Sequence, residues 1–245
     1  MLICDHATNR VPEGYGDLGV GAEQLSRHIG YDIGAAGVTE RLSALLGAPA
    51  ILSNFTRLFI DPNRGEDDPT LVMQLSDGAV VPGNAGISAE EIERRLAHFY
   101  APYHAAIDAA IDEALEAGRP PVLLSIHTFT ENWKGVGRPW HAGILWDKDP
   151  RLAVPLIEAL SRDPALHVGD NEPYRGALRG DCMYKHGTRR GLAHALVEIR
   201  QDLVATEQGQ AAWAERLAQV MRPFLNEETA PPGLHEIRHF GSHTD

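Results

Sequence analysis

The stretch P-V-L-L-S-I-H, residues 121–127, decides the fold class of this sequence. It opens with a continuous apolar run. A strand with one face exposed to solvent would instead alternate apolar and polar residues. Such a run is typical of a strand covered on both faces, as in a largely parallel sheet. Further apolar runs of this kind occupy residues 2–4, 48–55, 141–146 and 194–199. Together they predict the strands of one sheet.

Amphipathic helices are predicted between these strands. Residues 35–46 place Val38, Leu42 and Leu45 on one face, and Gly47 is expected to end the helix. The longest helix is expected to begin at the capping box of Ser88 and Glu91 and to end near residue 118, with an interruption at Pro102. Two more helices are expected over residues 151–160 and 210–225.

The alternation of strands and helices predicts a single α/β domain. We expect three layers, α/β/α, around a mixed, largely parallel sheet. The domain is expected over residues 1–226, followed by a polar C-terminal tail over residues 227–245. Residues 65–86 are rich in Gly, Pro and Asp, which is typical of a long surface loop or a lid.

The charge of the chain restricts its partners. Its 245 residues carry 22 Lys and Arg against 34 Asp and Glu, a net charge of -12. No basic cluster is present in the sequence, so nucleic acid and anionic membranes are not expected as partners. A small anionic molecule remains a candidate, because a few buried arginines can bind it. With only two cysteines and no signal-peptide pattern at the start, we expect a cytoplasmic protein.

Several polar residues follow the predicted strands, where open α/β sheets bind their ligands. His6 follows the first strand and His127 the third, and such a pair suits a zinc site. Zinc acidifies water to a pKa of about 7, and a nearby carboxylate such as Glu198 can then act as general base. The alternatives are that both histidines are ordinary hydrogen-bonded residues and that Glu198 forms a structural ion pair with Arg200.

Other residues are candidates for substrate binding. Asn63 and Arg64 follow a strand-like segment, and an arginine there can bind a carboxylate in bidentate fashion. A surface salt bridge is the alternative. Arg138 lies in a Gly-flanked loop, and Asn171 and Tyr174 lie in a turn-forming run. The sequence contains neither a Gly-rich phosphate loop nor G-x-S-x-G, which argues against nucleotide chemistry and a serine hydrolase.

In their order along the chain, these motifs resemble the N-formylglutamate amidohydrolase family from residue 2 to about residue 204. The motifs are D-H-A-T-N-R-V-P, H-I-G-Y-D-I-G-A, T-R-L-F-I-D-P-N-R-G, S-I-H-T-F, G-R-P-W-H-A-G-I-L, D-N-E-P-Y, H-G and H-A-L-V-E-I-R-Q-D. The family is similar to zinc-carboxypeptidase-like and other zinc-exopeptidase (phosphorylase/hydrolase)-like folds and, more distantly, to aspartoacylase. The resemblance implies zinc-dependent hydrolysis of the amide of an N-acyl acidic amino acid, in amino-acid catabolism.

The resemblance implies a role for each matching residue. His6 and His127 would bind zinc, Asn63 and Arg64 would hold the substrate carboxylate, and Glu198 would be the general base. The related H-x-x-E pattern reads His6-Ala7-Thr8-Asn9 here, so Asn9 is the expected third ligand.

Two alternatives for the third ligand are Asp5 and Asp32, and Asp32 is otherwise expected as a second catalytic carboxylate. The first motif reads C-D-H-A-T-N where the characterised deformylases have P-H-A-G, so the formylglutamate substrate does not follow directly. A zinc peptidase or amidase with a larger substrate such as a cell-wall fragment, or a binding protein that has lost catalysis, remains an alternative.

Overall fold

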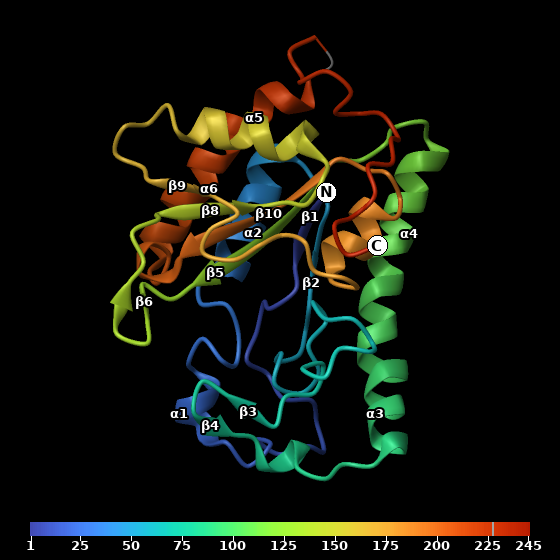
Figure 1. The fold of residues 1–245 in the computed structure, drawn as a ribbon, viewed down its shortest axis with the longest axis vertical. Helices are drawn as coiled ribbons and strands as arrows, with labels where there is room; N and C mark the ends of the chain where they lie inside the picture. The colour runs from blue at the N-terminus through green and yellow to red at the C-terminus, as the bar shows by residue number, and fades with distance from the viewer. Residues whose placement is uncertain (227) are drawn as a thin grey trace.

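A six-stranded sheet forms the centre of the computed structural model, which describes residues 1–226 and 228–245 (Figure 1). The strands run in the order β2-β1-β5-β10-β8-β9. All neighbouring pairs are parallel except β10 and β8, which are antiparallel. This confirms the predicted mixed, largely parallel sheet. The strands are β1 (Leu2–Cys4), β2 (Ala50–Leu52), β5 (Leu123–Phe129), β8 (Ala142–Leu145), β9 (Val168–Asp170) and β10 (His194–Arg200).

Three helices cover one face of the sheet. They are α2 (Ala35–Leu46), α5 (Pro150–Leu160) and α6 (Glu207–Met221). Apolar side chains from these helices form one core with alternate residues of the strands, among them Leu124 and Ile126 of β5. Gly47 ends α2 in the left-handed conformation, with φ at 61°, as the sequence predicted.

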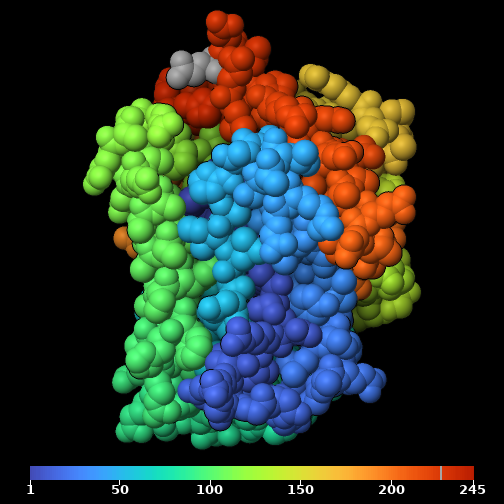
Figure 2. Space-filling view, turned by 180° about the vertical axis from the view of Figure 1, so that it is seen from behind, coloured from blue at the N-terminus to red at the C-terminus, as the bar shows by residue number. Residues whose placement is uncertain are grey.

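The opposite face is covered by α4 (Ala101–Glu116) and by the chain from Phe55 to Ile60. Ile107 and Ile111 of α4 pack there with Ile3 and other residues in a second buried core. The predicted three-layer arrangement is therefore present. In the view from behind, N-terminal segments and α2 occupy the space between the long α3–α4 region and the C-terminal segments (Figure 2).

The long helix expected from Ser88 is built in sections. The Ser88 hydroxyl accepts a hydrogen bond from the Glu91 amide at the start of α3 (Ala89–Arg95). One turn of π-helix, Leu96–Tyr100, joins α3 to α4, and Pro102 lies in the first turn of α4. Because proline has no N–H to donate, the helical bonding is interrupted at the predicted place.

Residues 65–86 are more closely packed than a mobile loop would be. They carry the hairpin of β3 (Leu75–Ser76) and β4 (Ala79–Val80), and Leu71 and Val81 are buried in the second core. All of these residues are described, and none of them lines the pocket at the carboxyl ends of β5 and β10. Apolar residues at both ends of the segment thus anchor it to the body of the domain.

The remaining elements are short. Helix α1 (Gly21–Leu25) and the hairpin of β6 (Asn132–Trp133) and β7 (Val136–Gly137) lie away from the sheet (Figure 1). The C-terminal residues fold back on the domain, where Ser242 and His243 contact Asp147. No helix within residues 1–226 and 228–245 is both long enough and apolar enough to span a bilayer.

Candidate active site

The carboxyl halves of β5 and β10 place polar side chains on the face of the sheet that α4 covers. The two strands pair in parallel, with His127 opposite Glu198. Side chains alternate along a strand, so Leu123 and His127 share one face, which is the face of the second core. A pocket of about 390 Å³ opens there, and both His127 and Glu198 line it.

His6, Asp32 and His127 form a buried cluster in this pocket. Their side chains are 1%, 4% and 3% exposed. Oδ2 of Asp32 lies 3.4 Å from Nδ1 of His6 and 2.8 Å from Nδ1 of His127. The backbone amide of Asp32 donates to the carbonyl of His6, which brings the loop before α2 to the end of β1. The structure therefore unites three residues that are distant in the sequence.

Two further carboxylates contact the Nε2 atoms of the two imidazoles. Nε2 of His6 lies 2.7 Å from Asp61, and Nε2 of His127 lies 2.9 Å from Asp5. Burial would raise the pKa of Asp5, yet hydrogen bonding and charge from His127 hold that pKa well below its usual value. Burial would likewise lower the pKa of His127, but its hydrogen bonds to Asp32 and Asp5 keep that pKa well above the ordinary value.

The chemistry of this donor set fits a metal ion. His6, Asp32 and His127 each offer a ligand atom, and these atoms lie within 4.8 Å of one another. Metal-binding histidines usually donate their second ring N–H to a carboxylate, as Asp5 and Asp61 would accept here. Two imidazoles and one carboxylate are a common ligand set of catalytic zinc.

Glu198 is the buried carboxylate beside this cluster. It is 7% exposed, and its Oε2 has no hydrogen-bond partner among the described residues. Burial raises its pKa to about 7, and the neighbouring charge of Asp32 adds to the rise. Arg200, the structural partner that the sequence suggested, instead forms an ion pair with Asp202. A buried carboxylate without a partner is costly, which is typical of a functional group.

Asn63 and Arg64 both line the same pocket. The side-chain oxygen of Asn63 accepts a hydrogen bond from the Cys182 amide, which fixes the orientation of this amide group. Nε of Arg64 lies 4.0 Å from Asp61 and has no hydrogen-bond partner among the residues described. The Arg64 side chain is 29% exposed and lines the pocket, so its guanidinium is within reach of an anionic ligand there.

The other predicted substrate-binding residues lie at or behind the rim. Tyr174 lines the pocket, and the Arg138 guanidinium stacks 5.0 Å from the centre of its ring. Arg138 is not itself among the described lining residues. The side-chain oxygen of Asn171 accepts from the amides of Trp146 and Gly176, so it positions two lining residues.

Asn9, the third ligand expected from the resemblance, has no contact with the cluster among the described hydrogen bonds. It is half-buried, and it is not one of the lining residues in the described part of the chain. Strand β1 ends at Cys4, and Asn9 lies in the irregular segment that follows. The carboxylate that meets both histidines is that of Asp32.

Some site residues had little signal in the sequence. Arg57 bridges Asp61 and Asp32, at 2.8 Å and 3.5 Å. Asp181 is a buried lining residue, and burial raises the pKa of its carboxyl group to about 7. Arg57 stands in the T-R-L-F-I-D-P-N-R-G motif, but nothing in the spacing singled out Asp181.

Comparison with known proteins gives consistent matches. The family model described as N-formylglutamate amidohydrolase matches residues 1–205. A crystal structure of a gene product from Agrobacterium tumefaciens is 35% identical, with a TM-score of 0.86, over 90% of this chain and 88% of that one. The crystal structure of N-formylglutamate amidohydrolase from Ralstonia eutropha JMP134 shares the fold at 23% identity, with a TM-score of 0.68 and coverage of 89% and 90%. No match was found among curated proteins.

The extent of these matches settles the family. The family model spans most of the chain, and the 35% identical structure covers nearly all of it. The matched region contains every residue of the cluster described above. The chain is thus a hydrolase of amide bonds and belongs to the N-formylglutamate amidohydrolase family.

Proposed function

We propose that this protein hydrolyses the amide bond of an N-acyl acidic amino acid, with N-formylglutamate as the first candidate substrate, by means of a metal ion. The observation that carries the proposal is the buried, unpartnered carboxylate of Glu198 beside the His6, Asp32 and His127 cluster. Family membership supports the choice of substrate.

His6, Asp32 and His127 would hold the metal through both Nδ1 atoms and a carboxylate oxygen. Zinc fits this donor set, and it would polarise the amide carbonyl and acidify water as a Lewis acid. Asp5 and Asp61 orient the two imidazoles by accepting hydrogen bonds from their Nε2 atoms. Asp32, one of the three candidates that the resemblance left open, would take the third position in place of Asn9.

Glu198 would act as general base and then as general acid. It takes a proton from the attacking water, whose oxygen forms a bond to the acyl carbon. When the carbon–nitrogen bond breaks, Glu198 returns the proton to the leaving nitrogen. For N-formylglutamate the products are formate and glutamate, so all atoms balance. The environment of Glu198 suits both roles, since a general base works best with a pKa near the operating pH.

Arg64 and Asn63 would bind the carboxylate of the substrate. Burial on one side of the Arg64 side chain lowers the dielectric around it and strengthens an ion pair with an anion. Tyr174, which stacks with Arg138, forms part of the rim. Asn171 would contribute by holding the loop that contains Tyr174.

The size of the pocket supports a small substrate. Its volume of about 390 Å³ lies near the lower end of the usual range for ligand pockets, roughly 300–1,000 Å³. A single acylated amino acid fits such a volume. A peptide or cell-wall fragment would have to extend beyond the rim formed by Tyr174.

A hydrolysis assay tests the proposal. The purified protein, supplied with zinc, is incubated with N-formyl-, N-acetyl- and N-succinyl-L-glutamate and with N-formyl-L-leucine, and release of the free amino acid is measured. We expect release from an acylated glutamate and much slower release from the leucine compound. Hydrolysis of cell-wall fragments without hydrolysis of any acylated amino acid would contradict the proposal.

A further inference from the structure

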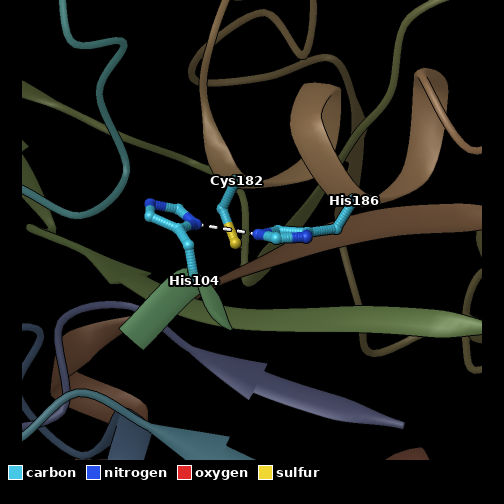
Figure 3. Close-up of side chains that lie close together, drawn as sticks. All are labelled: His104, Cys182 and His186. Atoms are coloured by element: carbon cyan, nitrogen blue, oxygen red, sulfur yellow. Dashed lines mark hydrogen bonds between the residues drawn. The ribbon is translucent and has the colours of Figure 1, made fainter. Parts of the chain in front are cut away.

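A second cluster of metal-ligating side chains lies outside the pocket. His104 of α4 faces His186, and the sulfur of Cys182 lies next to the line that joins the two rings (Figure 3). The three side chains are 8%, 0% and 2% exposed in the order His104, Cys182, His186. None of the three is among the described residues that line the pocket.

The distances within this cluster are those of a compact site. Nδ1 of His104 and Nε2 of His186 are 2.8 Å apart, and all three residues offer ligand atoms within 4.8 Å of one another. Two nitrogens bound to one zinc ion at about 2.0–2.1 Å each lie roughly 3.3 Å apart at a tetrahedral angle. The two rings would need to separate by only about half an ångström.

The surroundings of His186 match those of a metal ligand. Its Nδ1 lies 3.0 Å from a carboxylate oxygen of Asp108, and Arg190 binds the same oxygen at 2.9 Å. An outer carboxylate of this kind fixes the tautomer, because Nδ1–H donates to Asp108 and leaves the lone pair of Nε2 directed into the cluster.

The ring of His104 donates to His186 through one nitrogen and leaves its other nitrogen buried. Since Nε2 of His186 accepts, Nδ1–H of His104 donates between the two rings. Nε2 of His104 is then a buried nitrogen that makes no hydrogen bond of regular geometry among the described residues, although the Pro62 carbonyl lies near this ring. An unsatisfied polar atom of this kind is rare in a folded protein and calls for an explanation.

We propose that His104, Cys182 and His186 bind a second metal ion, of the zinc class, that has a structural role. On binding, the Cys182 thiol releases its proton to solvent, and the His104 ring proton moves from Nδ1 to Nε2. Two imidazoles and one thiolate suit borderline-soft ions such as Zn²⁺. The ion would join α4 to residues 181–188, of which Asp181 and Tyr184 line the pocket.

Cobalt distinguishes this site from the one in the pocket. Co²⁺ occupies zinc sites, and a thiolate ligand gives it a charge-transfer absorption that nitrogen and oxygen ligands do not give. The cluster of His6, Asp32 and His127 contains no sulfur, so such an absorption reports only on a cysteine. Cys4, also fully buried, packs in the core against α2 and provides a matched control.

The experiment titrates metal-free protein with Co²⁺ alone and records the thiolate absorption. We expect the absorption of one thiolate-bound Co²⁺ ion per chain in the wild type, in Cys4→Ser and in His6→Ala. We expect no such absorption in Cys182→Ser. Asp108→Asn keeps all three ligands, and we expect it to weaken Co²⁺ binding by roughly 10–100-fold, the usual effect of losing an outer-shell partner. Melting temperatures of all variants verify folding.

Three results would overturn the proposal. They are the absence of a thiolate band in the wild type, a band that persists in Cys182→Ser, and an unchanged affinity in Asp108→Asn. The last comparison remains decisive if Cys182→Ser fails to fold, because Asp108 is about half exposed and its replacement leaves the core intact. None of these readouts depends on hydrolytic activity, so failure here leaves the proposed reaction untouched.

Discussion

His127 and Glu198 lie opposite each other on the parallel strands β5 and β10, and both line the same pocket. Strand pairing fixes their separation more firmly than a loop would. A base held by one strand beside a metal ligand held by the next needs little reorganisation during the reaction. The architecture of the sheet therefore accounts for the central part of the site.

Removal of His6 tests the metal site in the pocket. We expect His6→Ala to lose one equivalent of zinc per chain and all measurable hydrolysis, because one of three ligands is missing. The replacement should leave the chain folded. Metal analysis and a melting curve on the same preparation measure both effects. His167→Ala, at an exposed histidine, is the matched control and should retain its zinc. Full zinc content in His6→Ala would refute the assignment.

Replacement of Arg64 tests substrate recognition. Arg64→Lys keeps the charge but loses the bidentate fork. One charge-assisted hydrogen bond contributes about 1.5 kcal/mol or more, so we expect KM to rise roughly tenfold with little change in kcat. The matching substrate control is the neutral amide of the same compound, which the wild type should hydrolyse poorly. Equal wild-type activity on the acid and on its amide would show that Arg64 does not bind a carboxylate of the substrate.

His194 predicts a pH dependence of stability. Its Nδ1 donates to the Leu192 carbonyl, and its Nε2 accepts from Thr188, so the ring is neutral and fully hydrogen-bonded. Burial lowers its pKa below the ordinary value of 6.5. The unfolded chain therefore takes up a proton as the pH falls through about 6.5, whereas the folded chain does not, and stability is lost.

The variant His194→Asn keeps a donor near the position of Nδ1 and removes the titration. It should be less stable overall, because the ring packs tightly against Gly187. Its melting temperature should nevertheless fall less than that of the wild type between about pH 7.5 and about pH 5, on either side of the ordinary histidine pKa. An identical fall in both proteins would show that His194 does not contribute.

Arg95 is expected to hold residues 59–84 to α3. It is 1% exposed, and its guanidinium donates to the Phe59 carbonyl and to the side chain of Asn84, each at 2.7 Å. We expect Arg95→Ala to lower the free energy of unfolding by about 3–5 kcal/mol. The adjacent exposed Arg94 is the control, and Arg94→Ala should cost less than about 1 kcal/mol. Denaturant unfolding would decide, and equal losses would contradict this role.

The sequence predicted the sheet well because its strands are continuous apolar runs. All five expected strands and the four main helices are present. Strand β9 was missed because Val168–Asp170 contains a single large apolar residue, and its pairing at the edge of the sheet depends on β8. Hairpins with strands of two residues leave no periodic pattern to recognise.

The candidate site was only partly predictable. His6, His127 and Glu198 follow or lie within strands of one sheet, and the fold brings them together as expected. Asp32 precedes a helix, and its position beside both histidines results from a tertiary hydrogen bond to the His6 backbone. The absence of Asn9 from the described residues that line the pocket likewise depends on how the chain turns after β1, which no local pattern encodes.

The most direct test of this account is the turnover number of Glu198→Gln on N-formyl-L-glutamate. Glutamine preserves the shape of the side chain and cannot accept the proton. We predict that kcat falls by about 10²–10⁴-fold, the usual contribution of a general base, while zinc content and melting temperature are retained. A kcat near the wild-type value in the folded, zinc-loaded variant would contradict the assignment of Glu198 as the base.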